Sequence, residues 1–169
     1  REVICNMIEI HGRTTPFDGG MFICSCDKGV PAHLKAIARL NMPSIVFAGG
    51  IMKAGPDNLT LEQIGSYSSM LKRKEITKEE FREKQLTACA SCGACAFMGT
   101  AASMQIMTEA LGLALPGTAA MPTTIPEFKT ASKNTGRQLL DLIKKGIKPS
   151  HILTEKAFEN AIMVHAAIA

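Results

Sequence analysis

Two short groups of residues carry most of the chemistry that this sequence could perform. They are Cys26-Asp27-Lys28 and Cys89-x-x-Cys92-Gly93-x-Cys95. Thiolates are soft ligands that suit iron–sulfur clusters or zinc, whereas a carboxylate is a hard ligand that suits magnesium. A thiolate next to an acid and a lysine therefore indicates two metal centres held side by side.

The three closely spaced cysteines of the second group leave several chemistries open. Zinc normally needs a second pair of Cys or His ligands at matching spacing, and the four histidines of the chain are isolated from one another. A redox-active pair would stand at the start of a helix that follows a strand, but Cys89 follows a predicted exposed helix. Iron–sulfur ligation fits best, by Cys26 together with one or more cysteines of the second group. Zinc, a redox pair and plain buried cysteines are the alternatives.

The first group is expected between a strand and a helix. In open α/β sheets, ligands bind at the carboxyl ends of the strands, and a helix amino terminus favours anions. Side chains of consecutive turn residues can point in different directions, so Cys26 could hold a cluster while Asp27 and Lys28 face a second centre. A simple Asp27–Lys28 salt bridge is the competing interpretation. Cys5 and Cys24 are expected to be buried as small apolar residues.

A strand–helix–strand unit should position the first group. Short apolar runs bounded by glycine or proline predict strands at 21–24 and 44–48, and a helix over 33–40 lies between them. Short connections of this kind are the signature of a parallel sheet covered by helices. We therefore predict an α/β fold, a three-layer α/β/α sandwich with a mainly parallel sheet that is incomplete within this chain.

The rest of the chain is predicted to be mainly helical. Helices are expected at residues 2–10, 60–74, 78–88, 95–113, 132–145 and 154–169. Thr77 with Glu80 offers a capping box at the start of one of them. The helix over 95–113 has few charges and should be buried on most sides. Gly49-Gly50, after the second strand, predicts a tight turn, or else an approach of backbone amides to a carboxylate or phosphate.

Composition narrows the class of protein. Hydrophobic residues make up 46% and charged residues 20% of the 169 residues, which are globular values. The net charge of +4 is mild and its basic residues are dispersed, so nucleic acid is not an expected partner. No apolar run is long enough to span a membrane. Six cysteines in a chain of this size are better explained by reduced, metal-binding thiols in the cytoplasm than by disulfides.

Several motifs together resemble the dihydroxy-acid dehydratase and phosphogluconate dehydratase family. They are Cys26-Asp27-Lys28-Gly-Val-Pro31, Arg39-Leu-Asn41-Met-Pro43, Gly49-Gly50-Ile-Met52 with Gly55, Ala88-Cys-Ala-Ser-Cys-Gly-Ala-Cys95, Gly99-Thr-Ala, Ser103-Met104 and Glu109-Ala-Leu-Gly-Leu113. The likeness runs in order over nearly the whole chain. It implies that residues 1–169 are part of the amino-terminal domain, which binds a cluster and magnesium, and that the carboxyl-terminal domain is absent from this chain.

The resemblance implies roles for the cysteines. Cys26 and Cys95 match the ligands of a two-iron, two-sulfur (2Fe–2S) cluster. Cys89 and Cys92 are reserve candidates, because some members of the family are associated with a four-iron (4Fe–4S) cluster instead. The serine that accepts the proton in the family, and further ligands, would lie outside this chain. No catalytic residue is therefore expected here, and the chain by itself should be inactive.

The resemblance also implies a magnesium site. Asp27 matches a magnesium ligand, and Lys28 matches a lysine that is carbamylated and becomes an oxygen ligand of the same ion. Capture of carbon dioxide needs a neutral amine, which a lysine with a lowered pKa can supply.

The implied reaction is the dehydration of a 2,3-dihydroxy carboxylate to a 2-keto acid by an iron–sulfur hydro-lyase with Mg²⁺. Ala32 and Ala90 depart from the pattern of the branched-chain biosynthetic members, so a sugar-acid (aldonate) dehydratase is the alternative. The rival of another class is a non-catalytic zinc-binding or interaction module. The family forms dimers and tetramers, and we expect a homo-oligomer.

Overall fold

The centre of the fold is a pair of parallel strands. The computed structural model describes residues 1–168. Strand β1 (Gly20–Cys24) pairs in parallel, and in register along its whole length, with β2 (Ser44–Ala48). Helix α2 (Gly29–Leu40) connects them. The predicted strand–helix–strand unit is therefore confirmed, and β2 is buried throughout, as expected for a strand covered on both faces.

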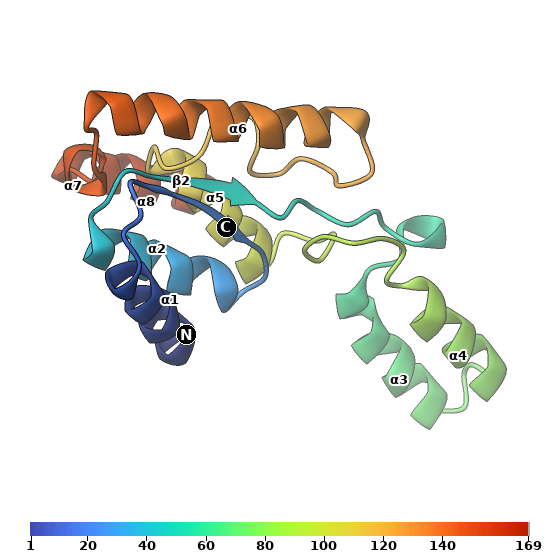
Figure 1. Cartoon of the computed structure of the whole chain (residues 1–169). Helices are drawn as coiled ribbons and strands as arrows, with labels where there is room; N and C mark the ends of the chain where they lie inside the picture. Colours follow the sequence, from blue (N-terminus) through green and yellow to red (C-terminus); the bar gives the residue numbers. More distant parts are fainter. Residues whose placement is uncertain (169) are drawn as a thin grey trace.

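Helices cover both faces of this sheet (Figure 1). Helix α6 lies along one face, and α1, α2, α5 and α8 lie on the other side. Their bounds are Glu2–Thr14 for α1, Thr100–Ala110 for α5, Pro126–Lys145 for α6, Pro149–Ile152 for the short α7 and Glu155–Ile168 for α8. Phe47 of β2 packs on Phe128 of α6 with ring centroids 4.9 Å apart. The predicted α/β layering is confirmed, around a small sheet.

The main core lies between the sheet, α2 and the segment that follows α5. Val30, Ile37, Val46 and Leu113 are almost completely buried and belong to one cluster, and burial of each such side chain contributes about 1.5–3 kcal/mol. The backbone N–H of Val46 also donates to the carbonyl of Leu113 at 2.7 Å. This contact fixes the end of α5 against β2. No helix within residues 1–168 combines the length and apolar character needed to cross a membrane.

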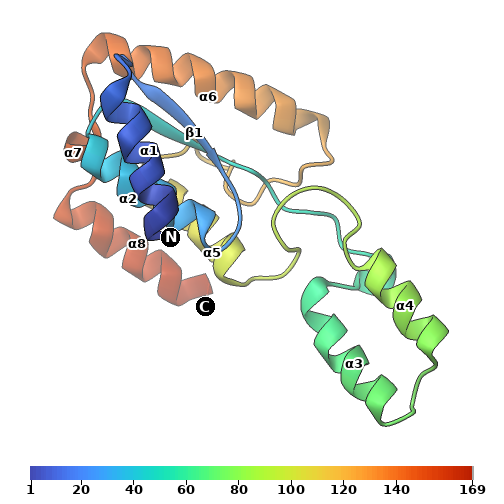
Figure 2. The same cartoon turned by 60° about the horizontal axis from the view of Figure 1, so that its bottom comes forward.

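A helical hairpin extends away from this body (Figures 1 and 2). It consists of α3 (Ile64–Lys72) and α4 (Lys78–Thr87), which pack against each other and contain no buried residue. Two short 3-10 turns precede it, η1 (Pro56–Asn58) and η2 (Leu61–Gln63). The predicted capping box is present at α4: the Thr77 hydroxyl accepts from the Glu80 N–H at 3.2 Å, and the Glu80 carboxylate accepts from the Thr77 N–H at 2.7 Å. We call residues 56–87 the arm.

Several helix bounds differ from those predicted. Helix α5 begins at Thr100 and not at 95, because Gly99 is extended and the backbone of Ala94 bonds to Gly50 and Met52 instead of continuing a helix. Helix α6 begins at Pro126 and not at 132, since proline suits the first position of a helix. Helix α3 starts at Ile64, after η2, and α1 continues to Thr14. The last residue of the final predicted helix, 169, lies outside the described residues.

Candidate functional site

The turn between β1 and α2, residues 25–28, is held in a strained conformation; we call it the strand-end turn. The backbone of Cys26 is left-handed, with φ 71°, and for a residue with a side chain this costs about 1–2 kcal/mol. Its carbonyl accepts a hydrogen bond from Val30 N at 3.3 Å, in the first turn of α2. Cys26 is free and exposed. Such strain persists only where the surrounding structure maintains it, and it is common at functional positions.

Asp27 and Lys28 form an ion pair. The Lys28 Nζ donates to Asp27 Oδ2 at 2.9 Å, and the Cys26 thiol lies 3.5 Å from Asp27 Oδ1. The hydrogen bond from Lys28 is the main reason why the pKa of the Asp27 carboxyl lies below its ordinary value. Both side chains are well exposed, 63% for Lys28 and 42% for Asp27. The salt bridge that the sequence left as a competing interpretation is therefore present, although an exposed pair of this kind is weak.

The segment with the other three cysteines, residues 89–95, returns from the arm to the body; we call it the cysteine loop. Ala94 N donates to the carbonyl of Gly50 at 2.7 Å, and the carbonyl of Ala94 accepts from Met52 N at 2.8 Å. Ile51 is thus paired with Ala94 as in a parallel sheet. Because Ala94 is fixed in this way beyond the carboxyl end of β2, the backbone of Cys95 is fixed beside it.

Gly93 makes this pairing possible. Its φ is +116°, and a Cβ at this position would lie 2.6 Å from Met52 N and 2.7 Å from the carbonyl carbon of Ile51. The Thr123 hydroxyl also donates to the carbonyl of Cys92 at 2.7 Å. Only a residue without a side chain allows the two backbones to approach so closely.

The ends of β1 and β2 are held together by two further contacts. Gly49 N donates to the carbonyl of Cys24 at 2.8 Å, and a Cβ on Gly49 would lie 2.7 Å from the Cβ of Ser25. Gln105 of α5 is completely buried, and its Nε2 lies 3.3 Å from Ser25 Oγ and 3.5 Å from the carbonyl of Gly50. The glycine pair therefore serves close backbone packing. The sequence analysis did not single out Gln105, although an amide in a helix expected to be buried on most sides was a signal for it.

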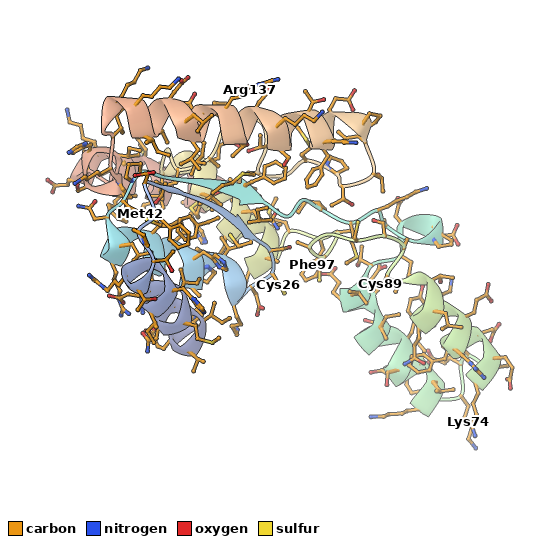
Figure 3. The ribbon with its side chains drawn as sticks, viewed as in Figure 1. Cys26, Met42, Lys74, Cys89, Phe97 and Arg137 are labelled. Atoms are coloured by element: carbon orange, nitrogen blue, oxygen red, sulfur yellow. The ribbon has the colours of Figure 1, made fainter. Side chains whose placement is uncertain are left out.

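The six cysteines are all free and differ in exposure. Cys5 and Cys24 are buried, as predicted, and burial raises the pKa of the Cys24 thiol to about 12. Cys89 and Cys92 are exposed and Cys95 is half-buried. Figure 3 shows Cys26 at the edge of the body and Cys89 farther out, towards the arm.

The structure brings some predicted site residues together. Asp27 contacts both Cys26 and Lys28. Within residues 1–168, no group of three or more His, Cys, Asp or Glu side chains is close enough to hold a metal ion. The strand-end turn and the segment paired with Ala94 of the cysteine loop both lie beyond the carboxyl ends of the two strands.

Comparison with known proteins identifies the family. The chain matches, over residues 1–169, the family described as dihydroxy-acid/6-phosphogluconate dehydratase, N-terminal. The chain belongs to this family. It is 42% identical to the dihydroxy-acid dehydratase of Halothermothrix orenii, over 99% of this chain and 31% of that protein. The dihydroxy-acid dehydratase of Clostridium pasteurianum is 40% identical, over 99% of this chain and 60% of that protein. The resemblance inferred from the motifs is confirmed.

The match covers nearly all of this chain but only part of each relative. The dihydroxy-acid dehydratase of Acetivibrio thermocellus is 41% identical over 99% of this chain and again 31% of its own length. The chain thus spans about a third of the length of several family members that it matches. Membership of the family is established over the whole chain, whereas the ligand roles of the cysteines, Asp27 and Lys28 remain predictions.

Proposed function

We propose that the intact protein is a hydro-lyase that dehydrates a 2,3-dihydroxy carboxylate to a 2-keto acid, with a 2Fe–2S cluster and Mg²⁺. The observation that carries the proposal is the family match along all 169 residues. The motif Cys26-Asp27-Lys28 adds support, because it lies at the carboxyl end of β1, where parallel sheets bind ligands.

Cys26 and Cys95 are the thiols that we assign to the cluster. Both are free and neither belongs to the buried core. Each follows a residue whose position is fixed by long-range contacts: Ser25 by Gln105, and Ala94 by Gly50. Cys89 and Cys92 remain reserve ligands for a 4Fe–4S cluster. When bound, the cluster would supply a Lewis acid for the departing hydroxyl group.

Asp27 and Lys28 are the residues that we assign to magnesium. A carboxylate is a hard oxygen ligand, and the lowered pKa keeps Asp27 ionised into the acidic range. Reaction of the neutral Lys28 amine with carbon dioxide would form an N–C bond, release a proton and leave a carbamate with two oxygen donors. The ion pair with Asp27 would be lost in that step, at little cost, because it is exposed.

Helix α2 supports the assignment of oxygen ligands to Asp27 and to a carbamate on Lys28. It begins directly after Lys28 and has twelve residues, and its amino terminus carries partial positive charge. This charge favours anionic oxygens at Asp27 and at the carboxylate of a substrate bound nearby. The chain's own contribution is thus to orient the ligands and to stabilise the anions near them.

The substrate class can be tested with the intact protein. We expect turnover of 2,3-dihydroxy-isovalerate, measured as formation of the 2-keto acid, to exceed turnover of a panel of aldonates. The reverse order would move the assignment to a sugar-acid dehydratase, and no keto acid from any member of the panel would refute the proposed reaction.

The role of Asp27 can be tested with a matched pair of variants. Asp27→Asn keeps the size of the side chain and removes the negative charge, so turnover and magnesium binding should be lost. Asp57→Asn makes the same change at an exposed position of the arm and should leave both unchanged. Full activity of Asp27→Asn would exclude the magnesium role.

A further inference from the structure

We propose that Gln105 is a positioning residue that sets the separation of Cys26 and Cys95. The inference rests on the proposed function only in naming these thiols as cluster ligands. Gln105 lies in the middle of α5 and has no exposed surface. A buried amide is unfavourable unless its polar atoms are paired, so its contacts need an explanation.

The Gln105 amide contacts the strand-end turn directly and the cysteine loop through Gly50. Its Nε2 lies 3.3 Å from the hydroxyl of Ser25, the residue before Cys26. The same nitrogen lies 3.5 Å from the carbonyl of Gly50. That carbonyl also accepts, at 2.7 Å, from the N–H of Ala94, the residue before Cys95. A single side chain therefore joins the strand-end turn to the cysteine loop through Gly50.

The orientation of the amide follows from its neighbours. The carbonyl of Gly50 can only accept a hydrogen bond, so the NH₂ group and not the oxygen must face it. The Oε1 atom of Gln105 is then buried without a partner among the described residues. An apolar side chain of the same size would avoid this unpaired acceptor. Gln105 is thus explained by the two segments that it joins, the strand-end turn and the segment after β2, and not by a gain in stability.

This explanation makes an unusual prediction for stability. Gln105→Met fills nearly the same space, removes the unpaired acceptor and breaks the link between Ser25 and Gly50. We expect this variant to unfold at a temperature equal to or above that of the parent protein, while the two thiols lose their fixed separation. If Gln105 only stabilised the fold, Gln105→Met would unfold at a lower temperature and the two thiols would keep their separation.

The test measures the separation directly in the intact, metal-free protein. Nitroxide labels are attached to Cys26 and Cys95 after Cys89 and Cys92 are replaced by Ser; Cys5 and Cys24 are buried and should stay unlabelled. Dipolar broadening of the continuous-wave electron paramagnetic resonance (EPR) spectrum, which suits labels on closely spaced thiols, should give one narrow distance distribution in the parent and a broadened or shifted one in Gln105→Met. Gln138→Met on α6 is the matched control and should leave the distribution unchanged.

A second variant keeps the test valid if Gln105→Met does not fold. Ser25→Ala removes one of the two contacts and should broaden the same distribution by a smaller amount. An unchanged distribution in whichever of these variants folds would overturn the proposal. In the cluster-loaded protein, Gln105→Met should also lose iron to a chelator about tenfold faster than the parent. Changed distances in a protein that binds no cluster would leave the positioning role intact and refute the proposed function alone.

Discussion

The strand-end turn and the cysteine loop fix their thiols in different ways. In the strand-end turn, Cys26 occupies a strained left-handed backbone between a strand and a helix. In the cysteine loop, Cys95 follows Ala94, whose two backbone hydrogen bonds tie it to the segment after β2. Cys89, at the other end of that loop, lies farther out towards the arm. The position of a thiol thus follows from the backbone contacts of its neighbours and not from the spacing of cysteines in the sequence.

Single cysteine replacements should have the largest effect on the two segments. Loss of a ligand is expected to lower cluster content and activity by at least about 100-fold, so Cys26→Ser and Cys95→Ser should each yield an intact protein without bound iron. Cys89→Ser removes a thiol of the same loop that we do not assign to the 2Fe–2S cluster, and iron per chain should be retained. Loss of iron in Cys89→Ser and its retention in Cys95→Ser would reverse our ranking.

Gly93→Ala should destabilise the protein through the cysteine loop. The added Cβ would overlap the backbone of Ile51 and Met52 at a positive φ, so we expect the free energy of unfolding to fall by about 3 kcal/mol. Gly136→Ala is the matched control, because a Cβ at this position in α6 meets nothing within 4 Å and should add about 0.5–1 kcal/mol. Urea denaturation followed by circular dichroism measures both changes. Equal midpoints would mean that the loop is not tied to the body as described.

The strain at Cys26 can be relieved without changing its neighbours. Cys26→Gly and Cys26→Ala both remove the thiol, but only glycine adopts φ 71° freely. Cys26→Gly should therefore be more stable than Cys26→Ala by about 1 kcal/mol. The same denaturation experiment compares them. A more stable alanine variant would show that the turn is not strained.

The smallest expected effect concerns the pKa of Asp27 and the pH dependence of the stability that its ion pair contributes. Its pKa is lowered mainly by the hydrogen bond from Lys28. The stabilisation from this pair is therefore present above the unfolded pKa of about 3.9 and is lost as the pH falls through the lower folded value. Lys28→Met should raise the pKa of Asp27, measured by the NMR shift of its carboxyl carbon. Lys53→Met is the control and should leave it unchanged; the same pKa in both variants would exclude the ion pair.

The sequence predicted local elements better than the contacts between them. The strands were found because apolar runs at 21–24 and 44–48 are bounded by glycine or proline, and the capping box at Thr77 because it needs only neighbouring residues. The start of α5 was misplaced because Ala94 pairs with Ile51, far away in the sequence. Pro126 was a local signal for the start of α6. The apolar pattern placed that start at residue 132 instead.

The candidate site was predictable to a similar degree. The motif Cys26-Asp27-Lys28 was placed at the end of a strand, where the structure has it. The two contacts of Gln105 join positions 80 and 55 residues apart, and no periodicity reveals such a link. Cysteine spacing left open which of Cys89, Cys92 and Cys95 joins Cys26, whereas the resemblance to the family favoured Cys95.

The most direct test of the whole account is a metal analysis of the intact protein purified without oxygen. Iron and inorganic sulfide, together with zinc and magnesium, would be measured per chain, alongside visible absorption and EPR. We expect iron and sulfide in equal amounts, with sulfur-to-iron absorption bands, and magnesium that is lost in Asp27→Asn. Zinc without these bands would contradict this expectation and would make the chain part of a structural zinc module.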